Sequence, residues 1–301
     1  IEFQEITRLY NLVSHDDQEH VDDMKEGWKV RDKNLKRERL LLYNDDIALG
    51  FLGYAQGRGE NHQNCYFNIY LDPEHDGKGY RQLLYEKMLE DVRVFKCNRL
   101  YANIYEHPNY INFKNLLIKN EFYIGLKIRE YSLDLNTVDL DKYSSLLRKL
   151  ESKDIKFYDA KNEMKEFPDH YIKLEELGWE YGKDFPMPEG ITHTREPFKQ
   201  FMKYQKLFED KRYGIEIVAV DGEKYIGSTD IHVFPKSDPH KAWTGSLGVL
   251  RKYRRQGIAT ALKIKAFTKL REKGIKQVRT DNEENNPMYK INVALGFIPE
   301  P

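Results

Sequence analysis

The feature that most constrains the fold of this 301-residue chain is an internal repeat. Gly79 and Gly257 lie 178 residues apart, and each follows an apolar run and precedes a helical pattern. Each half then adds a second apolar run, a second helical pattern and an aromatic residue. Because this length suits two domains, we expect two copies of one domain. They should occupy residues 1–140 and 154–301, joined by a linker helix over residues 141–153.

Apolar patterns place the expected elements in the same order in both halves. Alternation and short apolar runs predict strands at residues 1–6, 40–43, 47–54, 65–71, 100–105, 122–135, 155–158, 215–220, 225–233, 243–250 and 277–280. Apolar spacing of three and four predicts helices at residues 80–95, 109–119, 171–179, 198–208, 260–273 and 287–295. The polar stretch 11–39 should be helical in pieces.

Composition excludes several classes of protein. Lys and Arg together number 49, as do Asp and Glu, so the net charge is zero, which argues against a dedicated nucleic-acid binder. No run approaches the roughly 18 apolar residues of a membrane span, and no signal peptide follows Ile1. Cys65 and Cys97 are too few for a disulfide framework, and no Cys/His cluster has zinc spacing. We therefore expect a cytoplasmic protein without a metal, a membrane partner or a nucleic-acid partner.

The stretch most informative about function lies at residues 247–262. Four basic residues follow its apolar run: Arg251, Lys252, Arg254 and Arg255. Gly257 would then let the backbone approach a ligand closely, at the start of a helix whose first N–H groups are unpaired. Helix N-termini of this kind bind phosphate. The pattern predicts a pyrophosphate cradle, although a plain basic turn before an amphipathic helix is the alternative.

Two motifs in the second half resemble the GNAT acetyltransferase superfamily. Arg254-x-x-Gly257-x-Ala259 matches its Arg/Gln-x-x-Gly-x-Gly/Ala acetyl-CoA loop. The run TDNEENNPMYKINVALGF at residues 280–297 resembles a later segment of the same family. Through the internal repeat the whole chain is similar to tandem members, with a mycothiol-synthase-like architecture. The resemblance implies an α+β fold with two GNAT-like domains, each a mixed, mostly antiparallel sheet flanked by helices.

The resemblance also implies acetyl-CoA, or another acyl-CoA, as cosubstrate. The end of the strand before the loop would part from its neighbour and pair with the pantetheine arm, and the loop would cradle the pyrophosphate. Asn286 and Asn292 would bind the pantetheine or the acetyl end, although Asn286 also fits a helix N-cap and Asn292 an exposed helix position. The residues assigned to the cofactor are Leu247, Gly248, Val249, Arg254, Arg255, Gln256, Gly257, Ile258, Ala259, Thr260, Asn282, Asn286 and Asn292.

The general base follows from the chemistry of the thioester. Attack needs a neutral amine, so a base must take a proton from the substrate ammonium. Asp230 and His232 lie two residues apart on one strand and hence on one face, and a histidine titrates near neutrality. Glu216 and a chain of water molecules are alternatives. Asp230 and His232 could also be surface residues of a half-exposed strand.

The general acid departs from the family pattern. Many members place a tyrosine four residues before the Gly-Phe pair, where this chain has Asn292. Tyr289 lies three residues earlier on roughly the same helix face, so it is the candidate donor to the leaving thiolate. It could equally be one of the packed or exposed tyrosines among the 21 in the chain.

The first half departs from the cofactor pattern. Asp76 stands where the family has Arg or Gln, and Arg81 stands where it has a small residue. A carboxylate repels a pyrophosphate and a long side chain obstructs it, so we expect this domain to be degenerate for CoA binding. The chain also ends four residues after Phe297 and lacks the family's final strand. Either the sequence stops short, or a strand from elsewhere completes the sheet.

The function expected is an acyl-CoA-dependent N-acyltransferase that moves an acetyl group to an amine by direct attack. The acceptor could be a small-molecule amine, an antibiotic, an amino acid or a peptide N-terminus. Trp179, Tyr181 and Phe185 lie in a helical region that would contact the acceptor or pack in the core. The alternative is a non-catalytic CoA-binding or interaction protein that retains the fold. The oligomeric state stays open.

Overall fold

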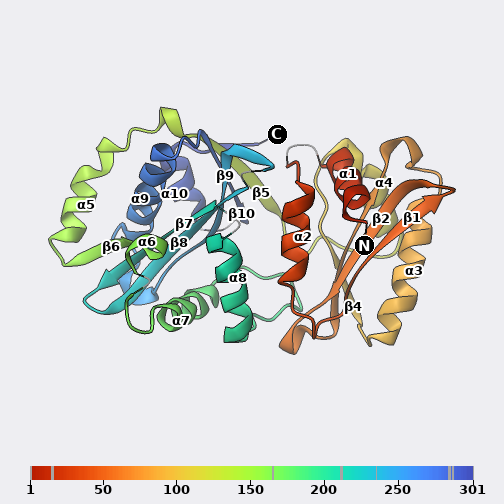
Figure 1. Cartoon of the computed structure of the whole chain (residues 1–301), viewed down its shortest axis with the longest axis horizontal. Helices are drawn as coiled ribbons and strands as arrows, with labels where there is room; N and C mark the ends of the chain where they lie inside the picture. The colour runs from red at the N-terminus through yellow and green to blue at the C-terminus, as the bar shows by residue number, and fades with distance from the viewer. Residues whose placement is uncertain are drawn as a thin grey trace. The chain divides into compact units, whose positions relative to one another are not determined.

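The structure is a computed structural model that describes residues 2–14, 17–164, 166–210, 213–234, 236–283, 286 and 288–300. Contacts divide the chain into two units (Figure 1). The first comprises Ile1–Gly125 and Pro188–Thr194, and the second comprises Leu126–Met187 and Arg195–Pro301.

The first unit has a four-stranded sheet in the order β1-β2-β3-β4. Its strands are β1 (Arg37–Asn44), β2 (Ile47–Gln56), β3 (Asn64–Leu71) and β4 (Arg99–Ala102). Its helices are α1 (Phe3–Val13), α2 (Val21–Lys29), α3 (Tyr80–Val94) and α4 (Ile111–Lys119). The first three strands are antiparallel and β4 is parallel to β3. Because α1 and α3 bury different sets of β2 and β3 side chains, they cover opposite faces.

The second unit has a seven-stranded sheet in the order β11-β5-β10-β9-β8-β7-β6. Its strands are β5 (Ile128–Asp134), β6 (Ile155–Asp159), β7 (Tyr213–Asp221), β8 (Lys224–Phe234), β9 (Asp238–Val249), β10 (Gln277–Glu283) and β11 (Ile298–Pro299). Its helices are α5 (Ser144–Glu151), α6 (Ala160–Glu163), α7 (His170–Gly182), α8 (Phe198–Asp210), α9 (Ile258–Glu272) and α10 (Met288–Leu295). Only β9 and β10 are parallel neighbours within it.

Alternating side chains of β7 show how this sheet is covered. Ile215 and Ile217 join a core with the apolar side chains of α9, whereas Val218 packs with Leu174 and Leu177 of α7. Successive strand residues point to opposite faces, so α9 covers one face and α7 the other (Figure 1). The chemistry described below lies on the α7 face and at the N-terminus of α9.

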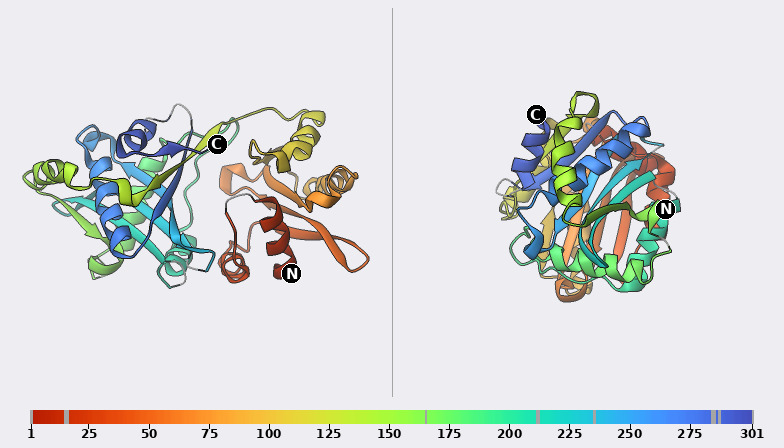
Figure 2. Two further views of the ribbon diagram at one scale, coloured as in Figure 1. Left: turned by 90° about the horizontal axis from the view of Figure 1, so that it is seen from above. Right: turned by 90° about the vertical axis from the view of Figure 1, so that its left-hand side faces the viewer.

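The strand β5 occupies the place in the second sheet where the family's final strand was expected. It follows the first unit in the sequence, yet it pairs antiparallel with β10 on one side and β11 on the other. Figure 2 shows the yellow-green β5 among blue strands of the second sheet. A strand from elsewhere therefore completes this sheet. Residues 126–140 consequently lie in the second unit by contacts, although the repeat placed them in a first domain of 1–140.

Most elements agree with their sequence patterns, and one does not. The strand predicted at residues 1–6 is wrong, because α1 begins at Phe3. Ile6, Leu9 and Val13 of α1 are buried at spacings of three and four, which is the helical period, and six residues were too few to reveal it. The rest of the fold expected from the sequence is present, including the β7–β8 hairpin and a helix, α5, within the linker.

The described residues lack the features of a membrane span and of a metal site. No helix there is both long and apolar enough to cross a membrane. The same residues contain no group of three or more His, Cys, Asp or Glu side chains placed to hold a metal ion.

Candidate active site

A gap between two parallel strands defines the site. The strands β9 and β10 pair only from Lys241 to Trp243, opposite Gln277 to Arg279. Thr244 then donates to the Thr280 hydroxyl (2.6 Å). Beyond this bond β9 continues beside β8 to Val249, and β10 continues beside β5 to Glu283. The strand edges of residues 245–249 and 281–283 thus turn away from each other, which leaves backbone groups of β9 for a ligand.

The loop after β9 has the geometry of an anion site. Gly257 is left-handed (φ 88°) and directly precedes the 15-residue helix α9. The first helical hydrogen bond runs from the Ala261 N–H to the Gly257 carbonyl (2.9 Å). The N–H groups of Ile258, Ala259 and Thr260 therefore precede the first repeating bond and point out of the helix end, where partial positive charge gathers. These residues fit a pyrophosphate.

Packing gives Gly257 a second role. A Cβ at this position would lie 2.5 Å from Leu146 Cδ1 of α5, so the linker helix packs directly against the loop. The Lys153 ammonium also donates to the Gln256 side-chain oxygen (3.4 Å). A side chain at residue 257 would therefore strain the backbone and force the Leu146 side chain to shift. A Gly257 variant would change this packing as well as ligand binding.

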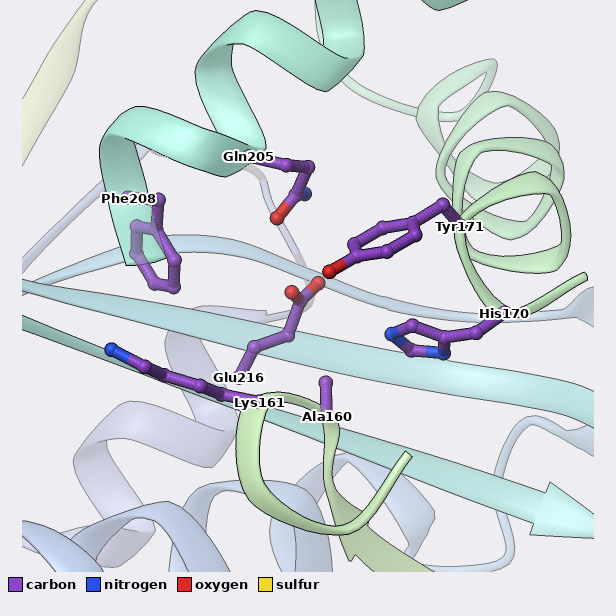
Figure 3. Close-up of a pocket in the computed structure, with 7 residues that line it drawn as sticks. All are labelled: Ala160, Lys161, His170, Tyr171, Gln205, Phe208 and Glu216. Atoms are coloured by element: carbon purple, nitrogen blue, oxygen red, sulfur yellow. The ribbon is translucent and has the colours of Figure 1, made fainter. Parts of the chain in front are cut away.

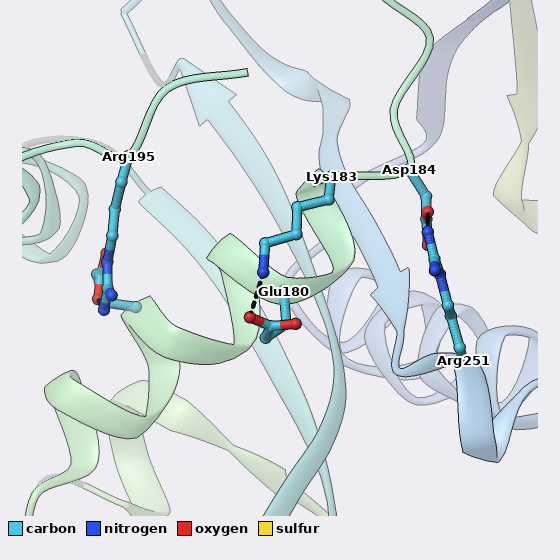
Figure 4. Close-up of polar contacts among 6 residues, drawn as sticks. Glu180, Lys183, Asp184, Arg195 and Arg251 are labelled. Atoms are coloured by element: carbon cyan, nitrogen blue, oxygen red, sulfur yellow. Dashed lines mark hydrogen bonds and ion pairs between the residues drawn. The ribbon is translucent and has the colours of Figure 1, made fainter. Parts of the chain in front are cut away.

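Two arginines of the loop share one carboxylate. Arg251 donates to Asp184 through Nε (3.1 Å) and through Nη2, and Arg254 donates to it through Nη2 (2.5 Å). Arg254 Nε also donates to the Val249 carbonyl at the end of β9 (2.8 Å). Figure 4 shows Asp184 and Arg251 facing each other. The sequence pattern identified the basic residues but gave no sign of Asp184.

Asp230 and His232, the residues predicted to act as the general base, contact each other at a bulge in the sheet. His232 Nε2 lies 2.7 Å from Asp230 Oδ2, and Asp230 Oδ1 accepts the Ser246 N–H (2.8 Å). The register shifts between Thr229 and Ile231, so Asp230 lies at the bulge. A Cβ at Gly245 would lie 1.9 Å from Asp230 Oδ2, so only glycine admits this contact.

Electrostatics fix how this pair is protonated. Burial acts to raise the pKa of Asp230, but bonds from His232 and Ser246 outweigh it and hold the pKa below its ordinary value. Asp230 is therefore an ionised acceptor, and His232 Nε2 donates to it. In the neutral imidazole this leaves the lone pair on Nδ1, which is buried and has no hydrogen-bond partner in the described structure. The ring of Phe208 in α8 lies edge-on to the imidazole at 4.8 Å.

The pair extends into a chain of hydroxyl groups that the sequence did not reveal. Ser246 Oγ donates to Asp230, and the Tyr181 hydroxyl lies 3.1 Å from Ser246 Oγ and 3.2 Å from Ser228 Oγ. Burial raises the pKa of Tyr181 to about 12. The ring of Tyr181 also occupies the space beside Gly248, where a Cβ would meet it at 2.0 Å. Tyr181 is therefore buried within the site, whereas the sequence left open whether it contacts the acceptor or packs in the core.

Glu216, the alternative base, lies on the same face as this pair. It is the partner of Asp230 in the β7–β8 register. It lines a small pocket with Ala160, Lys161, His170, Tyr171, Gln205 and Phe208. Figure 3 shows the Tyr171 hydroxyl and the Gln205 amide directed toward the Glu216 carboxylate. Phe208 is common to this pocket and to the His232 contact, so the two are neighbours on the α7 face.

The asparagines predicted for the cofactor differ in their surroundings. Asn292 is buried, not exposed, and donates to the Asn282 side-chain oxygen (2.5 Å). Its own side-chain oxygen is buried with no hydrogen-bond partner in the part of the chain that the structure describes. Asn286 accepts the Met288 N–H (2.9 Å) and so caps α10; Pro287, expected at the first helical position, lies outside the described residues. Tyr289 is 41% exposed and its ring lies 5.7 Å from that of Tyr131.

In the first unit, side chains fill the loop before α3 and bridge the point where β3 and β4 part. Arg81 donates to Asp76 through Nε (2.8 Å) and Nη2 (3.0 Å), so the two unusual residues of this loop pair with each other. Arg81 also donates to the Ile69 carbonyl (2.7 Å). Where β3 and β4 part, the Asn103 N–H donates to the Asn68 side chain (3.3 Å).

Comparison with known proteins identifies the family. The profile of the Acetyltransferase (GNAT) family matches residues 3–113 and 174–293. The chain belongs to this family. GNAT proteins are in general acyl-CoA-dependent acetyltransferases, and the two matched regions make this chain a tandem GNAT protein. No curated protein sequence matches the chain.

Solved structures support the tandem GNAT fold across the whole chain. A tandem GNAT protein from the clavulanic acid biosynthesis pathway is similar with a TM-score of 0.74 and 16% identity, over 99% of this chain and 91% of that one. A GCN5-related N-acetyltransferase from Sphaerobacter thermophilus has a TM-score of 0.67 and 15% identity, over 98% and 89%. A fungal glucosamine N-acetyltransferase region has a TM-score of 0.72 and 13% identity, over 99% of this chain but 36% of that larger one.

Proposed function

We propose that this GNAT chain transfers an acetyl group from acetyl-CoA to a primary amine, and that the second unit carries the reaction. The observation that supports this most is the joint geometry at the end of β9. The histidine–aspartate pair contacts β9 at Ser246, and the loop that follows β9 leads to an anion cradle at the α9 N-terminus. In the first unit the corresponding loop is filled by the buried Asp76–Arg81 pair.

The cradle and the parted strand would hold the cofactor. N–H groups of Ile258, Ala259 and Thr260 would bind the pyrophosphate, with Arg254 beside them. Backbone groups of Leu247 and Val249 would pair with the pantetheine arm along the strand edge. Acetyl-CoA supplies an activated thioester carbonyl when bound. N–H groups preorganised at the β9 bulge would stabilise negative charge that develops on its oxygen.

The histidine–aspartate pair would manage the substrate proton. Asp230 accepts the Nε2 proton and so leaves the Nδ1 lone pair of His232 as the proton acceptor for the ammonium. Because Nδ1 is buried, an acceptor would reach it after a side-chain movement or through a water molecule. We further propose that Tyr289, in the first turn of α10, donates to the departing sulfur.

The acceptor would enter on the face covered by α7 and α8. The base nitrogen and the pocket that contains Glu216 share the wall formed by Phe208. The Glu216 carboxylate and the Gln205 amide suit an acceptor with further ammonium or hydroxyl groups. Glucosamine belongs in the panel of test amines, because one similar structure is named as a glucosamine N-acetyltransferase.

A charge reversal in the cradle tests cofactor binding. Thr260 is the third residue of α9, where glutamate favours the helix dipole and so preserves folding. Thr260→Glu should abolish acetyl-CoA binding in calorimetry, whereas the similarly sized neutral variant Thr260→Gln should retain it. If both variants bind acetyl-CoA equally well, the α9 N-terminus does not hold the phosphates and the assignment is wrong.

Turnover separates the enzyme from the non-catalytic alternative. Wild-type protein should release free thiol from acetyl-CoA in the presence of one or more amines from a panel of diamines, amino sugars, amino acids and peptides. Thr260→Glu should show no release with any of them. Tight acetyl-CoA binding without turnover on every class of amine would favour the non-catalytic CoA-binding protein.

A further inference from the structure

Asp184 contacts the arginines of the cofactor loop but has no role in the proposed chemistry. It follows α7, and its carboxylate accepts bonds from Arg251 and Arg254. These bonds hold the pKa of Asp184 far below its ordinary value. The carboxylate is therefore ionised at any pH near neutrality, and it carries negative charge to the place where the cofactor would bring more.

The first unit shows what a permanent pair of this kind looks like. The side chains of Asp76 and Arg81 are 12% and 6% exposed. Breaking their ion pair would leave a buried charge without a partner. Asp184, Arg254 and Arg251 are 23%, 39% and 77% exposed. Exposed ion pairs contribute only about 0–1 kcal/mol each, so water and other anions can replace Asp184 at little cost. Another anion can therefore replace Asp184 as the partner of Arg251 and Arg254.

A pyrophosphate is a stronger partner than a single carboxylate. It offers more negative charge and several oxygens that suit the planar, two-donor geometry of arginine. Arg254 also donates through Nε to the Val249 carbonyl, so its planar guanidinium stays at the end of β9, with outer N–H groups available to a phosphate once Asp184 leaves. Asp184, which forms these ion pairs, lies two residues beyond the end of α7, and the last turn of α7 carries Tyr181.

From this geometry, and resting on the proposed function, we propose that Asp184 is an internal counter-ion that competes with the phosphates of acetyl-CoA for Arg251 and Arg254. It lowers the affinity of the second unit for the cofactor. The exchange also releases the C-terminal end of α7, so cofactor arrival loosens the helix that contacts the serine–aspartate–histidine chain.

Calorimetry with acetyl-CoA tests the competition. Asp184→Asn should bind the cofactor roughly threefold to tenfold more tightly than wild type, because two exposed ion pairs no longer oppose binding. Its affinity should also fall more steeply with salt, since more arginine charge is left for the phosphates. The matched control is Glu180→Gln, which removes an equal charge one turn earlier, where Glu180 pairs with Lys183 (2.5 Å). This control should stay within about twofold of wild type.

A second measurement needs no variant. Adding acetyl-CoA to the wild-type protein should increase hydrogen exchange at the amides of residues 182–187, because the tie at Asp184 is lost. Equal or weaker binding by Asp184→Asn would overturn the proposal, as would unchanged or slower exchange in this segment. Failure of the wild-type protein to bind acetyl-CoA would instead overturn the proposed function.

Discussion

His232 is the residue on which the proposed proton transfer depends. His232→Gln keeps an amide donor near Asp230 but removes the basic nitrogen, so kcat should fall by about 10²–10⁴-fold. The KM for acetyl-CoA should change little, because the cradle is untouched. The conservative variant keeps the bond to Asp230, so a loss of kcat reports the missing basic nitrogen and not a collapsed strand. A variant that keeps more than half of the wild-type kcat would show that water or Glu216 is the base.

Tyr289 carries the second prediction at this scale. Tyr289→Phe removes a hydroxyl and keeps the ring that packs beside Tyr131. If the hydroxyl donates to the leaving sulfur, kcat should fall at least tenfold while the acetyl-CoA KM changes little. Steady-state kinetics with saturating amine give both values. Loss of stability with unchanged kcat would make Tyr289 a packing residue.

Elements with a strong local pattern could be predicted from the sequence, whereas long-range exchanges could not. The β7–β8 hairpin is fixed by its apolar strands and the turn at Gly222, and α9 by its spacing and by Gly257. The α1 segment was too short to separate two periods. That β5 would join the second sheet depends on β10 offering an edge far away in the sequence, and no local pattern reports this.

The candidate site shows the same limit. The cradle is contiguous, so residues 254–260 could be named from their sequence, and Asp230 with His232 followed from the strand period. Asp184 and Tyr181 come to the site on a different element, α7, through packing alone. Asn292 was placed on the correct helix, but its burial against Asn282 depends on how α10 meets β10.

Within α9, Lys263 makes a prediction about stability. It is 2% exposed beside the rings of Phe267 and Phe297, and burial lowers its pKa to about 7. Between about pH 7 and pH 10 the unfolded chain holds this proton and the folded chain does not. The free energy of unfolding should therefore rise with pH there, by at most about 1.4 kcal/mol per pH unit. Urea titrations should show that Lys263→Met flattens this slope; an unchanged slope would contradict it.

Across the whole molecule, the two units have diverged at matching positions. In the second unit the cradle presents Arg254 and Ala259. In the first unit Asp76 and Arg81 fill the cradle with a buried ion pair. Loss of one partner would leave a buried charge, so this pair is stable and cannot yield readily to a phosphate. The repeat is thus one of fold, and this difference between the loops is what the proposed function rests on when it assigns the reaction to the second unit.

This divergence predicts one acetyl-CoA per chain. Calorimetric titration of the wild-type protein should give a stoichiometry near one, and Thr260→Glu should remove all measurable binding, because the first unit offers no second cradle. Two equivalent tight sites in wild type, or a tight site that survives Thr260→Glu, would show that the Asp76–Arg81 pair opens to the cofactor after all.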